Sequence, residues 1–204
     1  MDRTAATAHL LRQSGVRCVQ LWDGDCPDLD ATVGLSHLAA GRAAADIFLA
    51  AGLRHACYIG AQLGIDLCAA RRLTGFQQRM AEAGGTCRII ADDALPRDAS
   101  TGEDLTAPLL QDGTPPEAIH YLNDAMAIGG LRALLRAGVE VPRQTSVIGF
   151  NGTALRHAIQ TRLTTIEIPL DDVGARAAKA LLDAATRGTD QVPFRIVMGT
   201  TVRP

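Results

Sequence analysis

Lysine is almost missing from this chain of 204 residues, whose positive charge comes from arginine and a single lysine, Lys179. Aromatic residues are also scarce, at 3%, and the formal net charge is -2. A protein that grips a nucleic-acid backbone needs a clustered positive surface, whereas these arginines are scattered along the sequence. We therefore expect no direct binding of nucleic acid by this polypeptide.

Cysteine pairs of the CxxC type are absent, and the cysteines are five in number. Zinc sites and redox dithiols normally use such pairs, so we expect no metal site. Cys18, Cys57 and Cys87 stand in apolar runs, which favours reduced core thiols and a cytoplasmic protein. The first residues are too polar for a signal peptide, and no apolar run is long enough to cross a membrane.

Catalytic signatures are missing as well. The sequence contains no GxGxxG, GxxxxGK[ST], GxSxG or HExxH motif, so it gives no support for a dinucleotide or nucleotide cofactor or for a hydrolase. The histidines are dispersed, and a structural role is favoured over catalysis for His37, His55 and His120. We expect this protein to bind no cofactor and to be no enzyme, because its sequence does not group a nucleophile, a base and an orienting residue together.

Short apolar runs alternate with segments of helical period, which predicts an α/β protein with parallel sheets and helices on both faces. Strands are predicted at residues 17–22, 55–60, 86–91, 118–122, 145–150, 163–168 and 194–202. Helices are predicted at residues 4–14, 37–52, 67–83, 124–137 and 170–188, with a short helical patch at 153–160. The segment 92–116, rich in proline, predicts loops around at most one short helix.

Caps and faces follow from the same pattern. Ser36 and Asp124 stand where the N-caps of two helices are expected. One apolar face of the last helix is marked by Leu170, Val173, Ala177, Leu181 and Ala184.

Polar residues follow several of the predicted strands, at the sheet edge where open α/β proteins bind small molecules. These are Asp23, Asn123 and Asn151, together with Arg72 on the helix after residues 55–60. An asparagine after a buried strand is commonly a turn or cap residue, so the residues alone favour that role over binding.

Four segments of the chain, taken together and in this order, form a specific pattern: VGLSHLAAGRAAADIFLAAGLRHACYIGA, AARRLTGFQQRMAEAG, YLNDAMAIGGLRALLRAGVEVPRQTSVIGFNG and TTIEIPLDDVGARAAKALLDAATRG. Together they resemble the effector-binding core of bacterial transcription regulators of the lactose-repressor and galactose-repressor (LacI/GalR) type. The VQLWD and GFNG segments further resemble the branch of gluconate-operon repressors.

The resemblance implies a fold like that of periplasmic binding proteins, with two lobes built on parallel sheets. Residues 1–33 and 170–188 would form an incomplete N-terminal lobe, and residues 34–169 and 189–204 the C-terminal lobe. No helix-turn-helix domain is found, so the chain resembles a truncated regulator that would reach DNA only through a headpiece it does not contain.

The resemblance also assigns effector-binding residues. Arg72 stands where the family's arginine grips the effector, and its planar fork suits vicinal hydroxyls or a carboxylate. Asn123 matches the asparagine that bonds effector oxygens. Asn151 replaces an acidic residue of many sugar-responsive members, which favours an acidic or phosphorylated effector because the neutral amide repels no anion. Asp23 is a further candidate, with a loop-capping role equally open.

The implied function is the effector-binding and dimerisation portion of a transcription regulator that senses a sugar or a sugar acid such as gluconate. A free-standing sugar-binding protein of the same fold is the alternative, and the absent signal peptide and the unpaired cysteines count against it. The incomplete lobe leaves apolar surface to cover, which favours a homodimer.

The 204-residue polypeptide alone is expected to show no sequence-specific affinity for DNA, because its charge balance is acidic and its arginines are scattered. Fluorescence anisotropy at physiological salt measures this. Tighter binding of an operator duplex than of a scrambled duplex contradicts the expectation.

Overall fold

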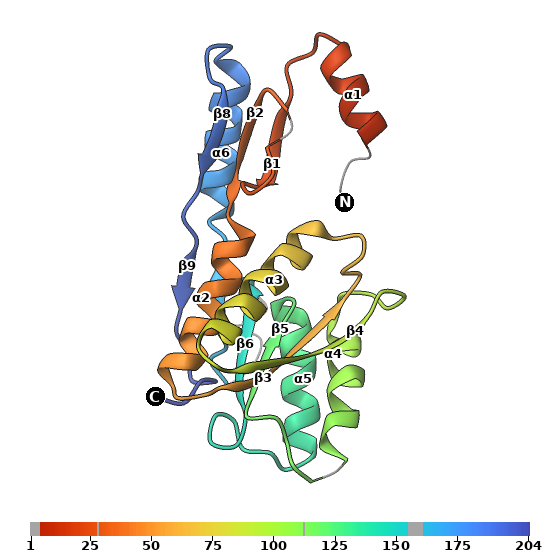
Figure 1. Cartoon of the computed structure of the whole chain (residues 1–204), viewed down its shortest axis with the longest axis vertical. Helices are drawn as coiled ribbons and strands as arrows, with labels where there is room; N and C mark the ends of the chain where they lie inside the picture. The colour runs from red at the N-terminus through yellow and green to blue at the C-terminus, as the bar shows by residue number, and fades with distance from the viewer. Residues whose placement is uncertain (1–4, 28, 112, 155–160) are drawn as a thin grey trace.

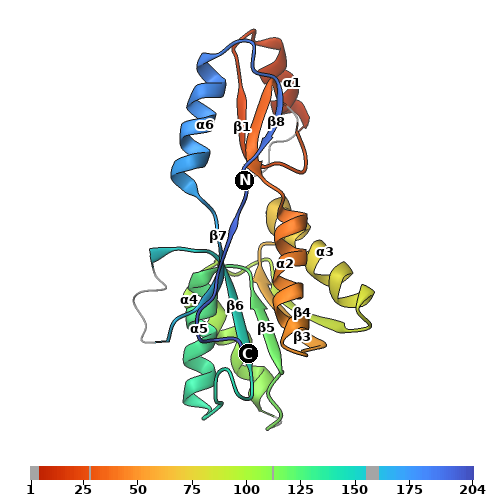
Figure 2. The same ribbon diagram turned by 90° about the vertical axis from the view of Figure 1, so that its left-hand side faces the viewer.

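The computed structural model describes residues 5–27, 29–111, 113–154 and 161–204, which form two α/β lobes of unequal size (Figure 1). The small lobe has a sheet of three parallel strands in the order β1 (Val19–Asp23), β2 (Ala31–Leu35) and β8 (Gly188–Gln191). Its helices are α1 (Ala5–Gln13) and α6 (Leu170–Leu182), and α6 packs on β1 and β2. The chain passes between the lobes after β2, after β7 and after β8 (Figure 2).

The large lobe contains a six-stranded sheet in the order β4-β3-β5-β6-β7-β9. Its strands are β3 (His55–Ala61), β4 (Thr86–Asp92), β5 (Ala118–Tyr121), β6 (Ser146–Asn151), β7 (Thr164–Glu167) and β9 (Arg195–Val197). Neighbouring strands are parallel except for β9, which is antiparallel to β7.

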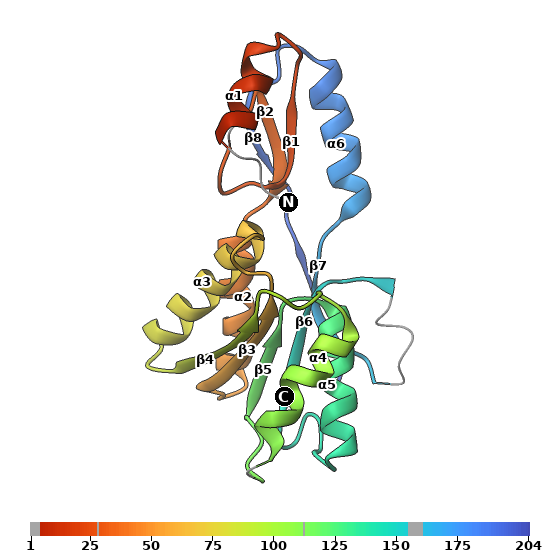
Figure 3. The same cartoon turned by 90° about the vertical axis from the view of Figure 1, so that its right-hand side faces the viewer.

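Two helix pairs cover the large sheet on opposite faces (Figure 3). One pair is α2 (His37–Ala50) with α3 (Leu67–Glu82), and the other is α4 (Ala99–Thr106) with α5 (Asp124–Arg136). The first pair buries Phe48, Phe76 and Met80 against the sheet, whereas the second buries Met126 and Leu134. Among the described residues no helix combines the length and the apolar character needed to span a bilayer.

Helices α2 and α3 approach each other closely because each has a glycine at the contact. A Cβ on Gly41 would lie 1.9 Å from the carbonyl oxygen of Arg72, and one on Gly75 would lie 2.1 Å from that of Leu38. No side chain fits at either position. This close approach brings the first turn of α2, with His37, beside Arg72 of α3.

The alternation of strands and helices is confirmed, with three differences at strands. Strands β2 and β8 were not predicted. The GTDQ run of β8 has no apolar residue and is exposed along its whole length, so no hydrophobic pattern indicates a strand there, whereas β2 is buried throughout. The expected lobe borders, 33/34 and 188/189, each cut a strand of the small sheet, since β2 ends at Leu35 and β8 at Gln191. Of the final run 194–202, only residues 195–197 form a strand, and it is antiparallel.

The helices agree with the predictions except at two ends. Ser36 caps α2, as predicted, accepting a hydrogen bond from the Ala39 amide at 3.0 Å. Asn123, and not Asp124, caps α5. Asp124 is instead the first helical residue, and its buried carboxylate accepts hydrogen bonds from the Thr153 amide and the Thr165 hydroxyl, both at 2.6 Å.

Helix α6 ends at Leu182, earlier than predicted, and its apolar face is narrower than predicted. Val173 and Ala180 are buried, but Leu170 and Leu181 are exposed, because the three-stranded sheet is too narrow to cover the whole stripe. The segment 92–116 contains one short α-helix, α4, followed by a 3-10 turn at Ala107–Leu110. Most of the helical patch expected at 153–160 lies outside the described residues.

Gly75→Ala is expected to lower the free energy of unfolding by roughly 1–3 kcal/mol, because the new methyl group forces α2 and α3 apart. Urea denaturation followed by circular dichroism measures the change. The matched control is Gly174→Ala in α6, where a Cβ meets nothing within 4 Å; the better helix propensity of alanine stabilises that variant by up to about 1 kcal/mol. Equal stability of the two variants contradicts the proposed close packing.

Candidate functional site

A cleft of about 1350 Å³ lies between the two lobes. It is lined from both sides, by Trp22 and the first turn of α6 in the small lobe and by α2, α3 and the strand ends of the large lobe. Residues at or after the carboxyl ends of six strands reach its wall: Trp22, Asp66, Arg97, Asn123, Asn151 and Glu167. This is the edge at which open α/β sheets bind ligands.

Arg72 places a buried guanidinium in the wall of the cleft. Arg72 is 3% exposed. Its Nη2 donates a hydrogen bond to the Leu122 carbonyl at 2.9 Å, and its Cζ lies 3.6 Å from the ring centroid of Phe150. Its Nε has no hydrogen-bond partner, and it forms no ion pair with a carboxylate of the described residues. A buried cation that forms no ion pair is unfavourable, so the site is suited to an anion.

His37 is the neighbour of Arg72 and stays neutral near pH 7. Burial, and then the positive charge of Arg72, lower the pKa of His37 to about 4, although the carboxylates of Asp25 and Asp66 and a hydrogen bond to the backbone of Trp22 act in the opposite direction. Since a guanidinium only donates, Nδ1 of His37 accepts from Nη1 of Arg72 at 3.1 Å. The ring hydrogen therefore sits on Nε2, which is buried.

The two asparagines differ in how free their amides are. Asn123 accepts from the Met126 amide at 2.8 Å as the N-cap of α5, and its Nδ2 donates to the Arg97 carbonyl at 3.0 Å. Asn151 ends β6 with a left-handed φ of 99°, and its side chain makes no hydrogen bond with the described residues. Asn151 thus offers the cleft an unengaged donor and acceptor.

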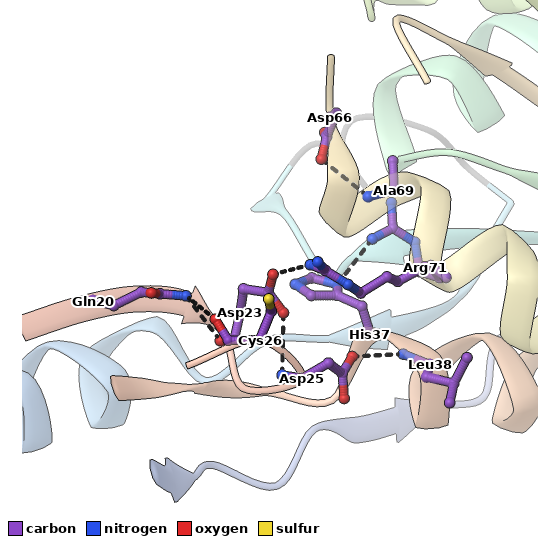
Figure 4. Close-up of polar contacts among 10 residues, drawn as sticks. Gln20, Asp23, Asp25, Cys26, His37, Leu38, Asp66, Ala69 and Arg71 are labelled. Atoms are coloured by element: carbon purple, nitrogen blue, oxygen red, sulfur yellow. Dashed lines mark hydrogen bonds and ion pairs between the residues drawn. The ribbon is translucent and has the colours of Figure 1, made fainter. Parts of the chain in front are cut away.

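Asp23 does not reach the wall of the cleft. Its carboxylate forms an ion pair with Arg71 of α3 and accepts a hydrogen bond from the Asp25 amide at 3.1 Å (Figure 4). The structure therefore brings Arg72, Asn123 and Asn151 together around the cleft, but it places Asp23 beside α3 instead.

Trp22 and His37 line the cleft although the sequence did not indicate them as site residues. Trp22 is the only tryptophan of the chain, is 43% exposed and has a left-handed φ of 79°, a strained backbone for this residue type. A Cβ on Gly34 of the adjacent strand would lie 2.4 Å from its carbonyl carbon, so Gly34 makes room for this conformation. The signals available were a lone tryptophan at a strand end and a histidine directly after a helix cap.

Most carboxylates around the cleft are already paired with arginines. Asp66 pairs with Arg97, Glu167 with Arg195, and Asp172 with Arg176. Asp171, in the exposed first turn of α6, forms no ion pair with a described residue. The carboxylate of Asp66 acts on Arg72 at longer range, but none of the ion pairs of the described residues includes Arg72. In the described ranges no three His, Cys, Asp or Glu side chains are grouped so that they could hold a metal ion.

Comparison with known proteins links this geometry to one group. Residues 45–204 match the family model of the periplasmic binding protein-like domain. The HTH-type transcriptional regulator GntR of Pseudomonas aeruginosa is 36% identical over 184 residues, which cover 89% of this chain and 52% of that protein. The chain therefore spans about half the length of this curated relative.

Two solved structures are similar over nearly the whole chain. A LacI family transcriptional regulator from Silicibacter pomeroyi has a TM-score of 0.90 and 27% identity, covering 100% of this chain and 63% of that one. The transcription regulator GntR from Chromobacterium violaceum has a TM-score of 0.85 and 27% identity, covering 98% and 75%.

The free energy of unfolding is expected to fall as the pH drops below the ordinary histidine pKa of 6.5, because two buried histidines stay neutral in the folded chain. His120 is fully buried between Tyr58 and Phe76, and burial lowers its pKa to about 3. The unfolded chain binds these protons and gains stability, so each of His37 and His120 accounts for a loss of about 2 kcal/mol between about pH 7.5 and about pH 5. Urea denaturation at the two pH values measures it.

His120→Phe keeps an aromatic ring at this position and removes one of the two titrating groups. It is expected to retain about half of the wild-type pH dependence over the same range. A pH dependence as large as that of the wild type contradicts the assignment.

Proposed function

Because this chain belongs to the family of periplasmic binding protein-like domains and is an effector-binding core of the LacI/GalR type, we propose that it senses a sugar acid such as gluconate. Its relatives are transcriptional regulators and not enzymes. The observation that carries the proposal is the buried guanidinium of Arg72, which lies in the cleft wall with an unpartnered Nε and no carboxylate.

The neighbours of Arg72 suit the remainder of such a ligand. A carboxylate on Arg72 would gain a charge-assisted hydrogen bond in a site of low dielectric. The imidazole of His37 and the amide of Asn151 also line the cleft and offer polar groups that match ligand hydroxyls. Trp22 supplies an apolar face from the other lobe for the carbon chain.

The neutral amide at Asn151 supports the acidic class of effector. A carboxylate at this position would accept hydrogen bonds from hydroxyls but would repel an anion bound at Arg72. Asn123 is a weaker candidate, because both ends of its amide already serve the cap of α5 and the Arg97 carbonyl.

We further propose that the core acts as a homodimer in a cytoplasmic regulator of transcription. Large apolar side chains that are exposed on the described surface, such as Leu135 at 77% and Leu182 at 87%, support self-association. The HTH-type regulator among the relatives supports a role in transcription over that of a free-standing sugar-binding protein.

Calorimetric titration with D-gluconate, and with D-glucose as the neutral comparison, tests the effector class. Arg72→Ala is expected to weaken gluconate binding by about 1.5–3 kcal/mol, the range for a charged hydrogen bond, and Asn123→Ala by about 0.5–1.5 kcal/mol. Wild-type protein that binds glucose and no sugar acid contradicts the proposal.

Asn151→Asp is the sharper variant, since it changes charge and barely changes shape. It is expected to weaken gluconate binding and to spare or improve glucose binding. Unchanged gluconate affinity shows that the neutral residue at this position does not select for an acid.

A further inference from the structure

A cluster of polar contacts joins the two lobes beside the cleft (Figure 4). On the small-lobe side it consists of the end of β1 and the loop that follows, and on the large-lobe side of the first turns of α2 and α3. The central contact is the ion pair between Asp23 of β1 and Arg71 of α3. Other ion pairs of the described chain, such as Arg42 with Glu82 between α2 and α3, join residues of one lobe.

Hydrogen bonds within the small lobe hold the Asp23 carboxylate in place. Its Oδ1 accepts from the Asp25 amide at 3.1 Å. The side chain of Gln20 donates to the carbonyls of Asp23 at 3.3 Å and of Cys26 at 2.9 Å, which holds the loop against β1. The carboxylate therefore moves with the small lobe as a rigid part of it.

The pair is also shielded from water. The side chain of Asp23 is 9% exposed and that of Arg71 is 28% exposed. Charges in such an environment attract each other more strongly than on an open surface, and salt screens them less. Separating the lobes would take Arg71 away from the buried Asp23 carboxylate.

A second contact connects the same loop to the hinge. Oδ2 of Asp25 accepts from the Leu38 amide at 3.0 Å, in the first turn of α2, directly after the chain passes from β2 into the large lobe. The two contacts hold the loop against both helices that carry His37 and Arg72.

We propose that the Asp23–Arg71 ion pair is a latch that holds the lobes closed and thereby sets the affinity of the cleft for its effector. Trp22 precedes Asp23 and Arg72 follows Arg71, so the latch fixes the separation of two opposite walls of the cleft. An effector that needs both walls binds only the closed form, and its apparent affinity falls in proportion to the closed fraction. The effect on affinity rests on the proposed function, whereas the closure itself does not.

The closure is tested without ligand on the whole 204-residue chain. Arg71→Gln and Asp23→Asn remove either charge, and Arg42→Gln is the control that breaks an ion pair within the large lobe. Small-angle X-ray scattering gives the radius of gyration, and acrylamide quenching gives the accessibility of Trp22, the sole tryptophan. Both latch variants are expected to have a larger radius of gyration and stronger quenching of Trp22 fluorescence than the wild type and Arg42→Gln. Arg71→Lys keeps the positive charge and is expected to restore both values.

Titration with D-gluconate then measures the consequence for binding. Arg71→Gln and Asp23→Asn are expected to weaken the affinity about three- to tenfold, with Arg42→Gln unchanged. If circular dichroism shows that the latch variants are folded and they are as compact as Arg42→Gln, the proposed latch is wrong. If neither the wild type nor any variant binds gluconate, but the latch variants are more extended than the control, the proposed latch is supported and the proposed effector is wrong.

Discussion

The buried guanidinium of Arg72 ties together the elements that form the cleft. It contacts the first turn of α2 through His37, the end of β5 through the Leu122 carbonyl, and β6 through the ring of Phe150. The close packing of α2 on α3 at Gly41 and Gly75 brings His37 and Arg72 together. Because moving a cation out of water costs several kcal/mol, the fold offsets that cost only in part, and the remainder favours a bound anion.

The helices of this protein were largely evident from its sequence, because glycines and caps mark their ends. Ser36 accepts a hydrogen bond in the first turn of the helix it precedes, and Gly52, Gly84 and Gly138 follow helix ends with positive φ. Strand β8 carried no such signal. Its four exposed residues are held by backbone pairing with β2, a contact between segments that lie far apart in the chain.

The candidate site was predictable where one strand and its own loop determine the position of a side chain. Asn123 reaches the cleft because it follows β5, Asn151 because it ends β6, and Arg72 from the helix after β3. The place of Asp23 depends instead on Arg71, which is 48 residues away and belongs to the other lobe. The roles of Trp22 and His37 likewise depend on how the two lobes face each other, which no local pattern encodes.

The pairing of β2 with β8 also bears on how the molecule is made. Ala31 and Gly188 are partners in the small sheet, so the chain must be synthesised through β8 before that sheet can close. The core strands of the large lobe are complete much earlier, because β3 to β7 follow one another without a detour. Contacts between distant segments form slowly, since loop closure precedes any gain from pairing. The large lobe, apart from its edge strand β9, is thus available as a folded platform for the small lobe, and the cleft forms only when β8 has paired.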